Sequence, residues 1–198
     1  MSPERGRQGV LVVISGPSGT GKTSICNALL ARDSSSMWSV SATTRPARGG
    51  EKAGRSYEYI SREEFEARRQ RGEFLESAEY LGQLYGTPAG PVREALAAGR
   101  DVIMEIDVQG GAQVARRMPD SVRVFVMPPT MESLKARLEG RRTESAEQLA
   151  RRLAQADGEI GFARDSACYQ HFVVNDVLED TVAEIAGIIE SERERLST

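Results

Sequence analysis

The sequence has little of what disulfide frameworks, metal centres and membrane spans are built from. Its 198 residues include two cysteines, Cys26 and Cys168, and a single histidine, His171. The cysteines lie far apart and match neither a disulfide framework nor a metal-ligand spacing, which favours a reducing compartment. The first apolar run, residues 10–14, is too short for a signal peptide or a membrane span. We therefore expect a soluble, cytoplasmic protein with no membrane partner, whose mature chain starts near residue 1.

An excess of positive charge is also missing. The chain carries 26 Lys and Arg against 29 Asp and Glu, a net charge of −3. This balance excludes a globally basic surface for nucleic acid, so any anion site must be local. With 39% hydrophobic residues the chain can form one well-buried core but not two independent ones, as two separate domains would need. We expect residues 1–198 to form a single domain.

Apolar, β-branched runs alternate with segments of helical periodicity along most of the chain. Continuous apolar runs are typical of strands that are buried on both faces. Strands that alternate with helices favour a parallel sheet, so we predict an α/β fold. The expected strands are residues 10–14, 102–106, 122–126 and 172–174, and the first helix is expected over residues 22–31.

Residues 38–90 break this rhythm with short alternating segments, which predict an inserted lobe of mixed strands. Inside the lobe, residues 61–64 (Ser-Arg-Glu-Glu) have the form of a capping box. This box predicts a helix over residues 65–71, which Gly72 closes.

Helical segments dominate the last third of the chain. Thr130 is expected to cap a helix that ends at Leu138, and residues 145–163 predict a second, longer helix. Residues 140–144 between these helices are polar and have the character of a hinge. The apolar stripe in residues 178–196 predicts a helix that packs on the core.

The strongest motif is G-x-x-x-x-G-K-[ST], which residues 16–23 satisfy between the first expected strand and the first helix. Its glycines let the backbone form a nest of N–H donors around phosphate oxygens, and the helix N-terminus adds positive potential. Lys22 is expected to reach the β and γ oxygens, and the Thr23 hydroxyl can ligate Mg²⁺. The residues assigned to the donor phosphates are Gly16, Pro17, Ser18, Gly19, Thr20, Gly21, Lys22, Thr23 and Ser24.

A phosphate loop alone is compatible with a GTPase, an ATPase motor or a small-molecule kinase. The N-K-x-D motif of guanine-specific GTPases is absent, since Asn175-Asp176 lacks the lysine and the spacing. A chain of 198 residues leaves little room for a motor. A kinase of a small acceptor is therefore the leading class.

Several side chains have the chemistry that an acceptor nucleotide needs. Arg45 and Arg48 lie in a loop stiffened by proline, where guanidinium groups can bind phosphate in a bidentate manner and Tyr57 adds a neutral hydroxyl. Glu105 and Asp107 follow a buried strand, at the end where ligands of open α/β sheets bind. A further carboxylate, a tyrosine and a hydroxyl can reach the same pocket from Glu76, Tyr85 and Thr87.

Taken in order, these motifs resemble the guanylate kinase family over residues 9–195. The sequence differs from the family at Glu105, where some members have Asp, and at Arg142, where others have Gly. The motifs that carry the resemblance are Ser41-x-x-Thr44-Arg45-x-x-Arg48, Gly50-Glu51, Tyr57, Phe74-Leu75-Glu76, Tyr85-Gly86-Thr87, Glu105-Ile106-Asp107, Pro128-Pro129, Arg137-Leu138-x-Gly140-Arg141-x-Thr143-Glu144 and Val174-Asn175-Asp176.

The resemblance implies a P-loop nucleoside-monophosphate-kinase fold that transfers the γ-phosphoryl group of Mg-ATP to GMP, and to dGMP, within purine nucleotide metabolism. It also implies three parts: a parallel-sheet core, a mixed GMP-binding lobe and a small helical lid. The core is expected at residues 9–37, 91–129 and 165–198, the lobe at 38–90 and the lid at 130–164.

The same resemblance implies roles for individual residues. Asp107 is expected near Mg²⁺, through water, and Asn175 beside adenine. The GMP phosphate region is expected at Ser41, Arg45, Arg48, Tyr57 and Tyr85, and guanine at Glu76, Thr87 and Glu105. The cations expected to act on the transferred group are Lys22, Arg45, Arg137, Arg141 and Arg152.

The chemistry of such a transfer agrees with a chain that has a single histidine. Joining two polyanions requires charge neutralisation more than nucleophile activation. An acceptor phosphate with a second pKa of about 6 needs no general base, so His171 is expected to be a strand residue. Two alternatives stay open: the same core with AMP or a pyrimidine monophosphate as acceptor, and a binding module that has lost nucleotide chemistry. The complete phosphate loop favours an enzyme.

Overall fold

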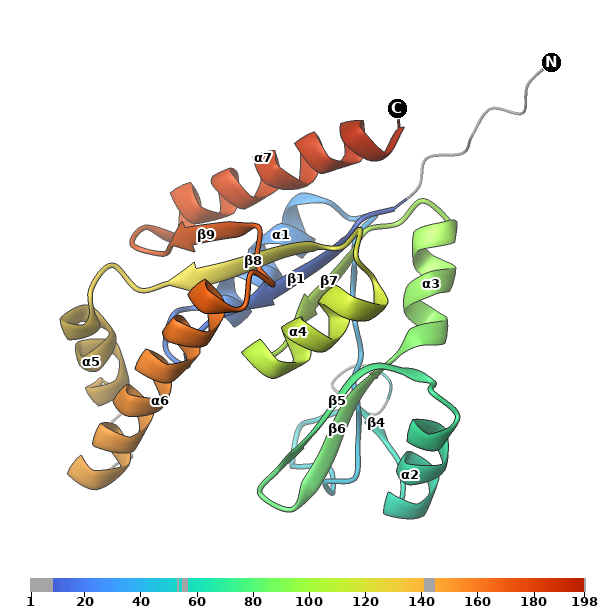
Figure 1. The fold of residues 1–198 in the computed structure, drawn as a ribbon, viewed down its shortest axis with the longest axis horizontal. Helices are drawn as coiled ribbons and strands as arrows, with labels where there is room; N and C mark the ends of the chain where they lie inside the picture. Colours follow the sequence, from blue (N-terminus) through green and yellow to red (C-terminus); the bar gives the residue numbers. More distant parts are fainter. Residues whose placement is uncertain (1–8, 53, 55–56, 141–144, 198) are drawn as a thin grey trace.

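A five-stranded parallel sheet forms the centre of the protein (Figure 1). The structure is a computed structural model that describes residues 9–52, 54, 57–140 and 145–197. Every strand expected for the sheet is present, and the parallel pairing confirms the predicted α/β fold. In spatial order the strands are β2 (Met37–Trp38), β7 (Val102–Glu105), β1 (Leu11–Ser15), β8 (Val122–Met127) and β9 (His171–Val174).

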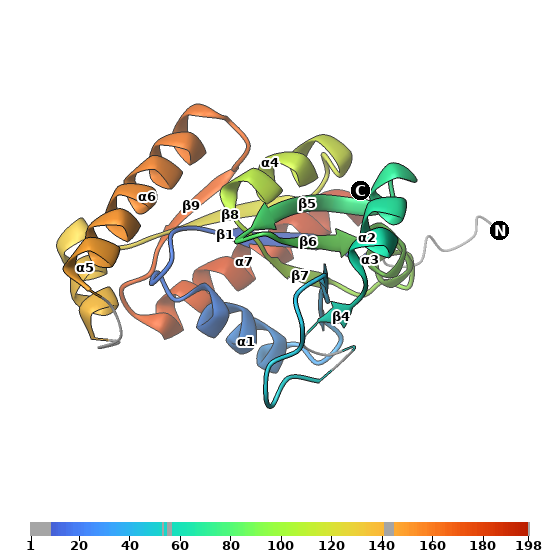
Figure 2. The same cartoon turned by 90° about the horizontal axis from the view of Figure 1, so that it is seen from below.

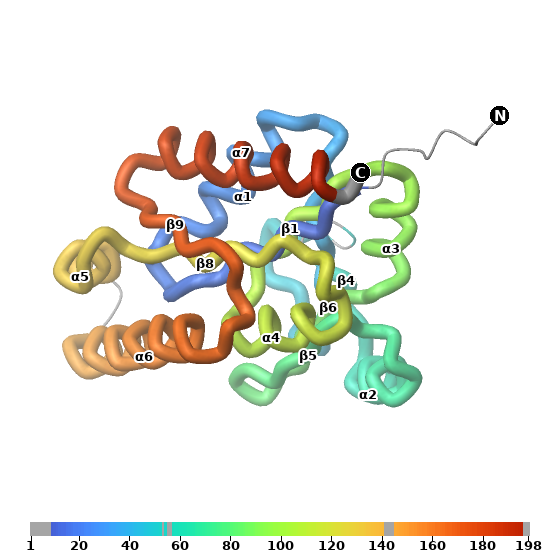
Figure 3. Tube along the Cα trace, turned by 45° about the horizontal axis from the view of Figure 1, so that its top comes forward, coloured from blue at the N-terminus to red at the C-terminus, as the bar shows by residue number. Residues whose placement is uncertain are grey.

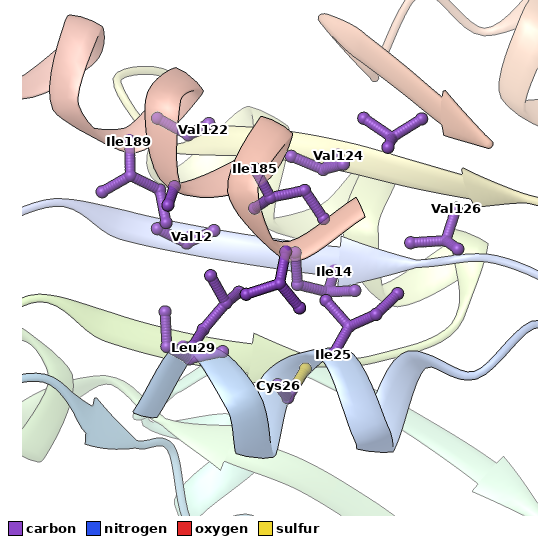
Figure 4. Packing of buried hydrophobic residues seen from close by; sticks show 14 of the residues in the cluster. Val12, Ile14, Ile25, Cys26, Leu29, Val122, Val124, Val126, Ile185 and Ile189 are labelled. Carbon is purple, nitrogen blue, oxygen red and sulfur yellow. The ribbon is translucent and has the colours of Figure 1, made fainter. Parts of the chain in front are cut away.

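Each face of the sheet has its own hydrophobic core. One face is covered by α1 (Lys22–Arg32) and α7 (Leu178–Ser197), and the other by α3 (Ala89–Ala97) and α4 (Val108–Arg117). Val12 and Ile14 of β1 pack toward α1 and α7, as Figure 4 shows. Leu11 and Val13 belong to the core on the opposite face. Burial on both faces explains why β1 is a continuous apolar run.

Two helices follow β8 and form a small helical unit at one end of the sheet (Figure 1). They are α5 (Met131–Glu139) and α6 (Ala146–Asp165), and Leu134 and Ala156 belong to the hydrophobic cluster between them. The C-terminal half of α6 joins a second cluster around Phe125 of the sheet. One end of α6 is therefore fixed to the core, while the other packs on α5.

Side-chain caps fix the starts of both helices. The Thr130 hydroxyl accepts from the Ser133 N–H at 3.0 Å, which confirms the expected cap of α5. Ser145 caps α6 in the same way, through the Gln148 N–H at 3.3 Å. Residues 141–144 of the predicted hinge lie outside the described residues.

A second sheet of four strands pairs in the mixed manner that the sequence predicts for this region. Its strands, in spatial order, are β4 (Glu58–Tyr59), β3 (Ala42–Thr43), β6 (Gln83–Pro88) and β5 (Phe74–Tyr80), and its helix is α2 (Arg62–Gln70). β3 is parallel to β4 and antiparallel to β6. Phe65 of α2 stacks on Phe74 with ring centroids 4.5 Å apart, so this sheet has a small core of its own.

Two details in this region differ from the prediction. Trp38 belongs to the parallel sheet, where it pairs with Ile103, and not to the mixed strands. Ser61 caps α2 by accepting from the Glu64 N–H at 3.1 Å, but the Glu64 carboxylate accepts from Arg68 at 2.8 Å. In a complete capping box the Glu64 carboxylate would accept from the backbone N–H of Ser61, but here it forms an i,i+4 pair with Arg68.

The two ends of the parallel strands differ, because the N-terminal end is closed by hydrogen bonds and the C-terminal end is open to a ligand. β5 runs along α4 (Figure 2), and Gln113 bonds both the N–H and the carbonyl of Ser77. The end of α7 lies beside the start of β1 (Figure 3), where Arg193 Nε donates to Asp101 at 2.8 Å and Asp101 accepts from the Val10 N–H. The hydrogen bonds of Asp101 close the N-terminal end of the parallel strands, and ligands of open sheets bind at the opposite end. Within the described ranges, every helix is too short or too polar to cross a membrane.

Candidate active site

The loop between β1 and α1 lies at the C-terminal edge of the sheet. Gly16 has φ +146°, and a Cβ there would lie 2.3 Å from the carbonyl oxygen of Val126. Only glycine allows this close approach of the loop to β8. Since α1 begins at Lys22, the positive end of its dipole lies next to the loop, as an anion site requires.

Lys22 is folded back onto this loop. Its Nζ donates to the carbonyl oxygens of Gly16 at 2.6 Å and Pro17 at 3.1 Å. Burial lowers the pKa of Lys22, while the carboxylates of Glu105 and Glu159 act in the opposite direction. The ammonium group is thus held beside the loop by backbone acceptors that a phosphate oxygen can replace.

The Thr23 hydroxyl lies against the carboxylate at the end of β7. It is 2.9 Å and 3.1 Å from the two carboxylate oxygens of Glu105. The sequence interpretation assigned Glu105 to guanine, whereas its carboxylate here faces the phosphate loop. Asp107 caps α4 by accepting from the Gly110 N–H at 2.8 Å. Hydroxyl and carboxylate oxygens are the ligands that Mg²⁺ takes, so these side chains fit the expected metal.

One cleft joins the phosphate loop to the second sheet. Its part beside the loop has a volume of about 490 Å³, and a pocket of about 270 Å³ continues along β5 and β6. A ligand of the loop and a ligand of the second sheet therefore face each other across the end of β7. The residues that line both parts are Ser41, Tyr57, Glu105, Ile106 and Asp107.

A buried carboxyl group lies in the second part of the cleft. Glu76 on β5 is 5% exposed, and the Thr87 hydroxyl on β6 donates to it at 2.7 Å. Ser41 Oγ is 3.5 Å from Thr87 Oγ1, which extends this pair to three polar side chains. Burial raises the pKa of Glu76 to about 7. A carboxyl group beside two hydroxyls can both accept and donate hydrogen bonds along the edge of a base.

Two of the residues expected to bind the GMP phosphate, Arg45 and Arg48, lie beside Glu51. Arg45 Nη2 donates to Glu51 at 2.8 Å, and its guanidinium carbon lies 5.4 Å from the centre of the Tyr57 ring. Glu51 also accepts from the Arg48 N–H at 2.7 Å and from the Tyr59 hydroxyl at 2.8 Å. The hydrogen bond from Arg45 is the main cause that lowers the pKa of Glu51 to about 2. An anion at Arg45 would therefore compete with an ion pair that is already present.

The sequence interpretation missed the roles of Glu51 and Tyr59. Glu51 was part of the motif Gly50-Glu51, but a residue in an irregular loop has no periodicity that shows what it contacts. Tyr59 carried a usable signal in the sequence, because residues two apart in a strand lie on the same face and Tyr59 is two residues from Tyr57. In the structure their rings lie 6.1 Å apart. Tyr85 meets Tyr57 edge-on at the same distance, 6.1 Å, and both tyrosines line the second part of the cleft.

The helical unit reaches the same cleft through α6. Arg152 Nη2 donates to Ser18 Oγ of the phosphate loop at 2.5 Å. Glu159 also lines the cleft, and burial raises its pKa. The seven-residue spacing puts both side chains on one face of α6, which is how Glu159 could have been found. Arg137 lies in the last turn of α5, and Arg141 lies outside the described residues.

Asn175 lies behind the phosphate loop. It is 6% exposed, and its Nδ2 donates to the carbonyl oxygen of Thr20 at 2.7 Å. The sequence interpretation put this residue beside adenine, but its amide here binds the backbone of the loop. A buried amide with a backbone partner belongs to the support of the site.

Comparisons with known proteins agree with this geometry. A sequence model of the guanylate kinase family matches residues 8–192. Guanylate kinases from Symbiobacterium thermophilum and Thermus thermophilus are 50% and 44% identical, over 95% and 96% of this chain and 88% and 84% of their own. The crystal structure of guanylate kinase from Anaplasma phagocytophilum is similar with a TM-score of 0.72 and 33% identity, and the match covers 94% of this chain and 87% of that one.

Proposed function

Because this chain belongs to the guanylate kinase family and transfers a phosphoryl group from ATP to GMP, we propose how its cleft divides this work. Residues 16–24 bind the phosphates of ATP, and the second sheet binds GMP. The proposal rests on one observation: the two parts of the cleft are continuous, and residues 105–107 at the end of β7 line both of them. With two nucleotides facing each other there, the γ-phosphoryl group passes directly from one to the other.

The transfer needs charge neutralisation more than it needs a base. A phosphate oxygen of GMP attacks the γ-phosphorus, the bond to the bridging oxygen breaks, and ADP leaves as GDP forms. The second pKa of the GMP phosphate is about 6, so the attacking oxygen is deprotonated near neutral pH. The cations that we assign to the phosphates are Lys22, Arg45, Arg137, Arg141 and Arg152.

We also propose that Mg²⁺ binds at Thr23, with Glu105 and Asp107 around it. When bound, Mg²⁺ neutralises charge on the β and γ oxygens. The hydrogen bonds between Thr23 and Glu105 support this assignment, because they bring two kinds of oxygen ligand together. Thr23, Glu105 and Asp107 would supply oxygen ligands to the ion beside the phosphates of ATP.

Guanine is assigned to Glu76 and Thr87, with Ser41 beside them. A carboxylate accepts from N1–H and from the N2 amino group of guanine, while a hydroxyl donates to O6. Adenine has the inverse pattern, with an acceptor at N1 and a donor at position 6. These contacts use the base and the phosphate, so we expect dGMP to be accepted as well. The GMP phosphate is assigned to Arg45, Arg48, Tyr57 and Tyr85.

The location that we propose is the cytoplasm. Cys26 and Cys168 are both free thiols, as is typical of a reducing compartment. Burial raises the pKa of Cys26 far above its ordinary range, which keeps this thiol unreactive.

The experiment that tests the acceptor is an ADP-release assay with Mg-ATP against a panel of nucleoside monophosphates. We expect a catalytic efficiency roughly 10²- to 10⁴-fold higher for GMP than for AMP, because AMP loses two charge-assisted hydrogen bonds of about 1.5–3 kcal/mol each. Equal use of AMP, or a preference for a pyrimidine, would overturn the assignment of Glu76 and Thr87.

A further inference from the structure

A series of buried hydrogen bonds supports the phosphate loop on the side that faces the protein interior. Asn175 follows β9, and its backbone N–H donates to the carbonyl of Met127 at the end of β8 at 2.9 Å. Its Nδ2 donates to the Thr20 carbonyl at 2.7 Å, and its Oδ1 lies 3.0 Å from the Thr181 hydroxyl. The single proton of this hydroxyl is shared with the carbonyls of Val177 at 2.9 Å and Val174 at 3.3 Å. Asn175, Thr20 and Thr181 are 6%, 0% and 2% exposed. This series of hydrogen bonds thus connects α7 to the loop through the interior.

The two partners of Asn175 fix the orientation of its amide. A carbonyl oxygen can only accept, so the Thr20 carbonyl requires Nδ2 on its side. This orientation turns Oδ1 toward the Thr181 hydroxyl, whose proton it shares with the Val177 carbonyl. The same Nδ2 lies close to Gly21, where a Cβ would be 2.5 Å away. The amide therefore packs against the last two loop residues before α1.

A phosphate-binding loop needs this kind of support. When its N–H groups turn toward an anion, its carbonyls turn away and need other donors. The carbonyls of Gly16 and Pro17 accept from Lys22, which would leave them on moving to a phosphate. The Pro17 carbonyl would keep its bond from the Thr20 hydroxyl at 2.8 Å. The Thr20 carbonyl accepts from Asn175, and the hydrogen bonds of the Asn175 side-chain amide do not involve Lys22. Asn175 is thus a support that persists when the nucleotide binds.

We propose that Asn175 is a positioning residue of the donor site. It holds Thr20 and Gly21 so that the N–H groups of the loop converge on a triphosphate, and Thr181 orients its amide. This inference rests on the proposed binding of the ATP phosphates by residues 16–24. It requires no contact between Asn175 and adenine, so its effect is the same for a polyphosphate with or without a nucleoside.

The test compares ATP with inorganic tripolyphosphate, each with Mg²⁺, as ligands in calorimetry. We expect Asn175→Ala to weaken both ligands about tenfold, the loss typical of one buried hydrogen bond to the backbone. The affinity for GMP, measured without ATP, stays unchanged. If ATP alone binds more weakly, Asn175 is an adenine contact and the inference is wrong. It is also wrong if neither ligand is affected.

Two further variants separate positioning from loss of stability. Thr181→Val keeps the shape of the side chain and removes its hydroxyl, so both ligands weaken by a smaller factor. Gln170→Ala is the matched control, because the Gln170 amide also bridges two backbone groups, the Arg123 N–H at 2.8 Å and the Ser121 carbonyl at 3.0 Å. We expect this control to lower the melting temperature and to leave both affinities as they are.

A last variant distinguishes failure of this inference from failure of the donor-site proposal on which it rests. Lys22→Met removes the lysine that the motif assigns to the phosphates. If it leaves tripolyphosphate binding unchanged, residues 16–24 are not the donor site. If it weakens that binding while Asn175→Ala and Thr181→Val do not, the donor site stands and only the role of Asn175 is wrong.

Discussion

The phosphate loop and the second sheet line the same cleft, but they are built from different parts of the chain. The loop is one continuous stretch, residues 16–24, and the groups it offers are mainly backbone N–H donors and Lys22. The acceptor site takes side chains from separate segments, among them Ser41, Glu76 and Thr87. A backbone site recognises charge and shape, whereas a side-chain site recognises a pattern of donors and acceptors.

Both regions keep their charged groups paired inside the protein. Lys22 is bound by loop carbonyls, Arg45 by Glu51, and the Glu76 carboxyl by the Thr87 hydroxyl. A ligand therefore replaces partners that already exist. The difference between the regions teaches what a substitution does: in the loop it lowers the rate with every acceptor, and in the second sheet it changes which acceptor is used.

The largest expected effect is in the loop. Lys22→Met is expected to slow the chemical step roughly 10²-fold or more, since a transition-state cation in a dry site contributes about 3 kcal/mol. GMP binding survives, because the acceptor site is untouched. Single-turnover kinetics measure the step. Lys135→Met, on the exposed face of α5, is the matched control, and near-normal turnover of Lys22→Met would contradict the donor site.

The next effect is one of selectivity. Glu76→Gln keeps the shape of the side chain but weakens its acceptance and adds a donor. We expect its catalytic efficiency with GMP to fall roughly 10- to 100-fold while that with AMP changes little, so the preference for GMP shrinks. An equal fall with both acceptors would mean that Glu76 supports the sheet without reading the base. Glu73→Gln is the control, because Glu73 lies just before the same strand, pairs with Arg71 at the surface and lines neither part of the cleft.

The phosphate loop and the acceptor site also differ in how far they could be predicted from the sequence. The loop is contiguous, so its motif and the apolar run of β1 are enough to predict strand, loop and helix together. Glu76 and Thr87 meet because β5 and β6 pair across the two-residue turn Leu81-Gly82. The sequence places these two side chains in one pocket, but it does not show which base they read. The roles of individual residues with GMP therefore depended on resemblance to a family.

Two side chains also point elsewhere than the sequence interpretation suggested, and the reason is physical. Glu105 ends a strand that borders both parts of the cleft, so its spacing cannot tell whether its carboxylate serves the loop or the base. Asn175 follows a strand end, where a side chain can point into the cleft or behind the loop. Hydrogen bonds with Thr23 and Thr20, which are remote in sequence, decide both directions.

A smaller effect is expected from the helical unit that reaches the loop. Arg152→Ala is expected to lower turnover roughly 10- to 30-fold and to change GMP affinity little, the pattern of a contact made chiefly in the transition state. Arg151→Ala is the matched control, because Arg151 is 78% exposed and pairs with Glu147. Steady-state kinetics and GMP titration give the two quantities. If GMP affinity fell as much as turnover, Arg152 would belong to the ground-state acceptor site.

The smallest expected effect is a pH dependence confined to the acceptor site. Glu76 must be ionised to accept from guanine, and burial raises its pKa to about 7. Between pH 8 and pH 6 most of Glu76 becomes neutral, so we expect GMP affinity to fall up to about tenfold. Titration of the GMP phosphate is common to wild type and Glu76→Gln, so the ratio of their affinities isolates the carboxyl group. A ratio that does not change with pH would contradict an ionised Glu76 as the guanine acceptor.

The same carboxyl group gives a measurement that needs no nucleotide. Its pKa is raised from an ordinary value of 4.5 to about 7, so the folded protein holds this proton more tightly than the unfolded chain. The resulting stability is complete below pH 4.5 and is lost as the pH rises to about 7, by at most about 1.4 kcal/mol per pH unit. Glu76→Gln is neutral throughout, so the free energy of unfolding of this variant must gain on that of the wild type over this range. Denaturant unfolding at each pH measures the difference. If the difference is constant, Glu76 does not titrate there, and the expected loss of GMP affinity needs another cause.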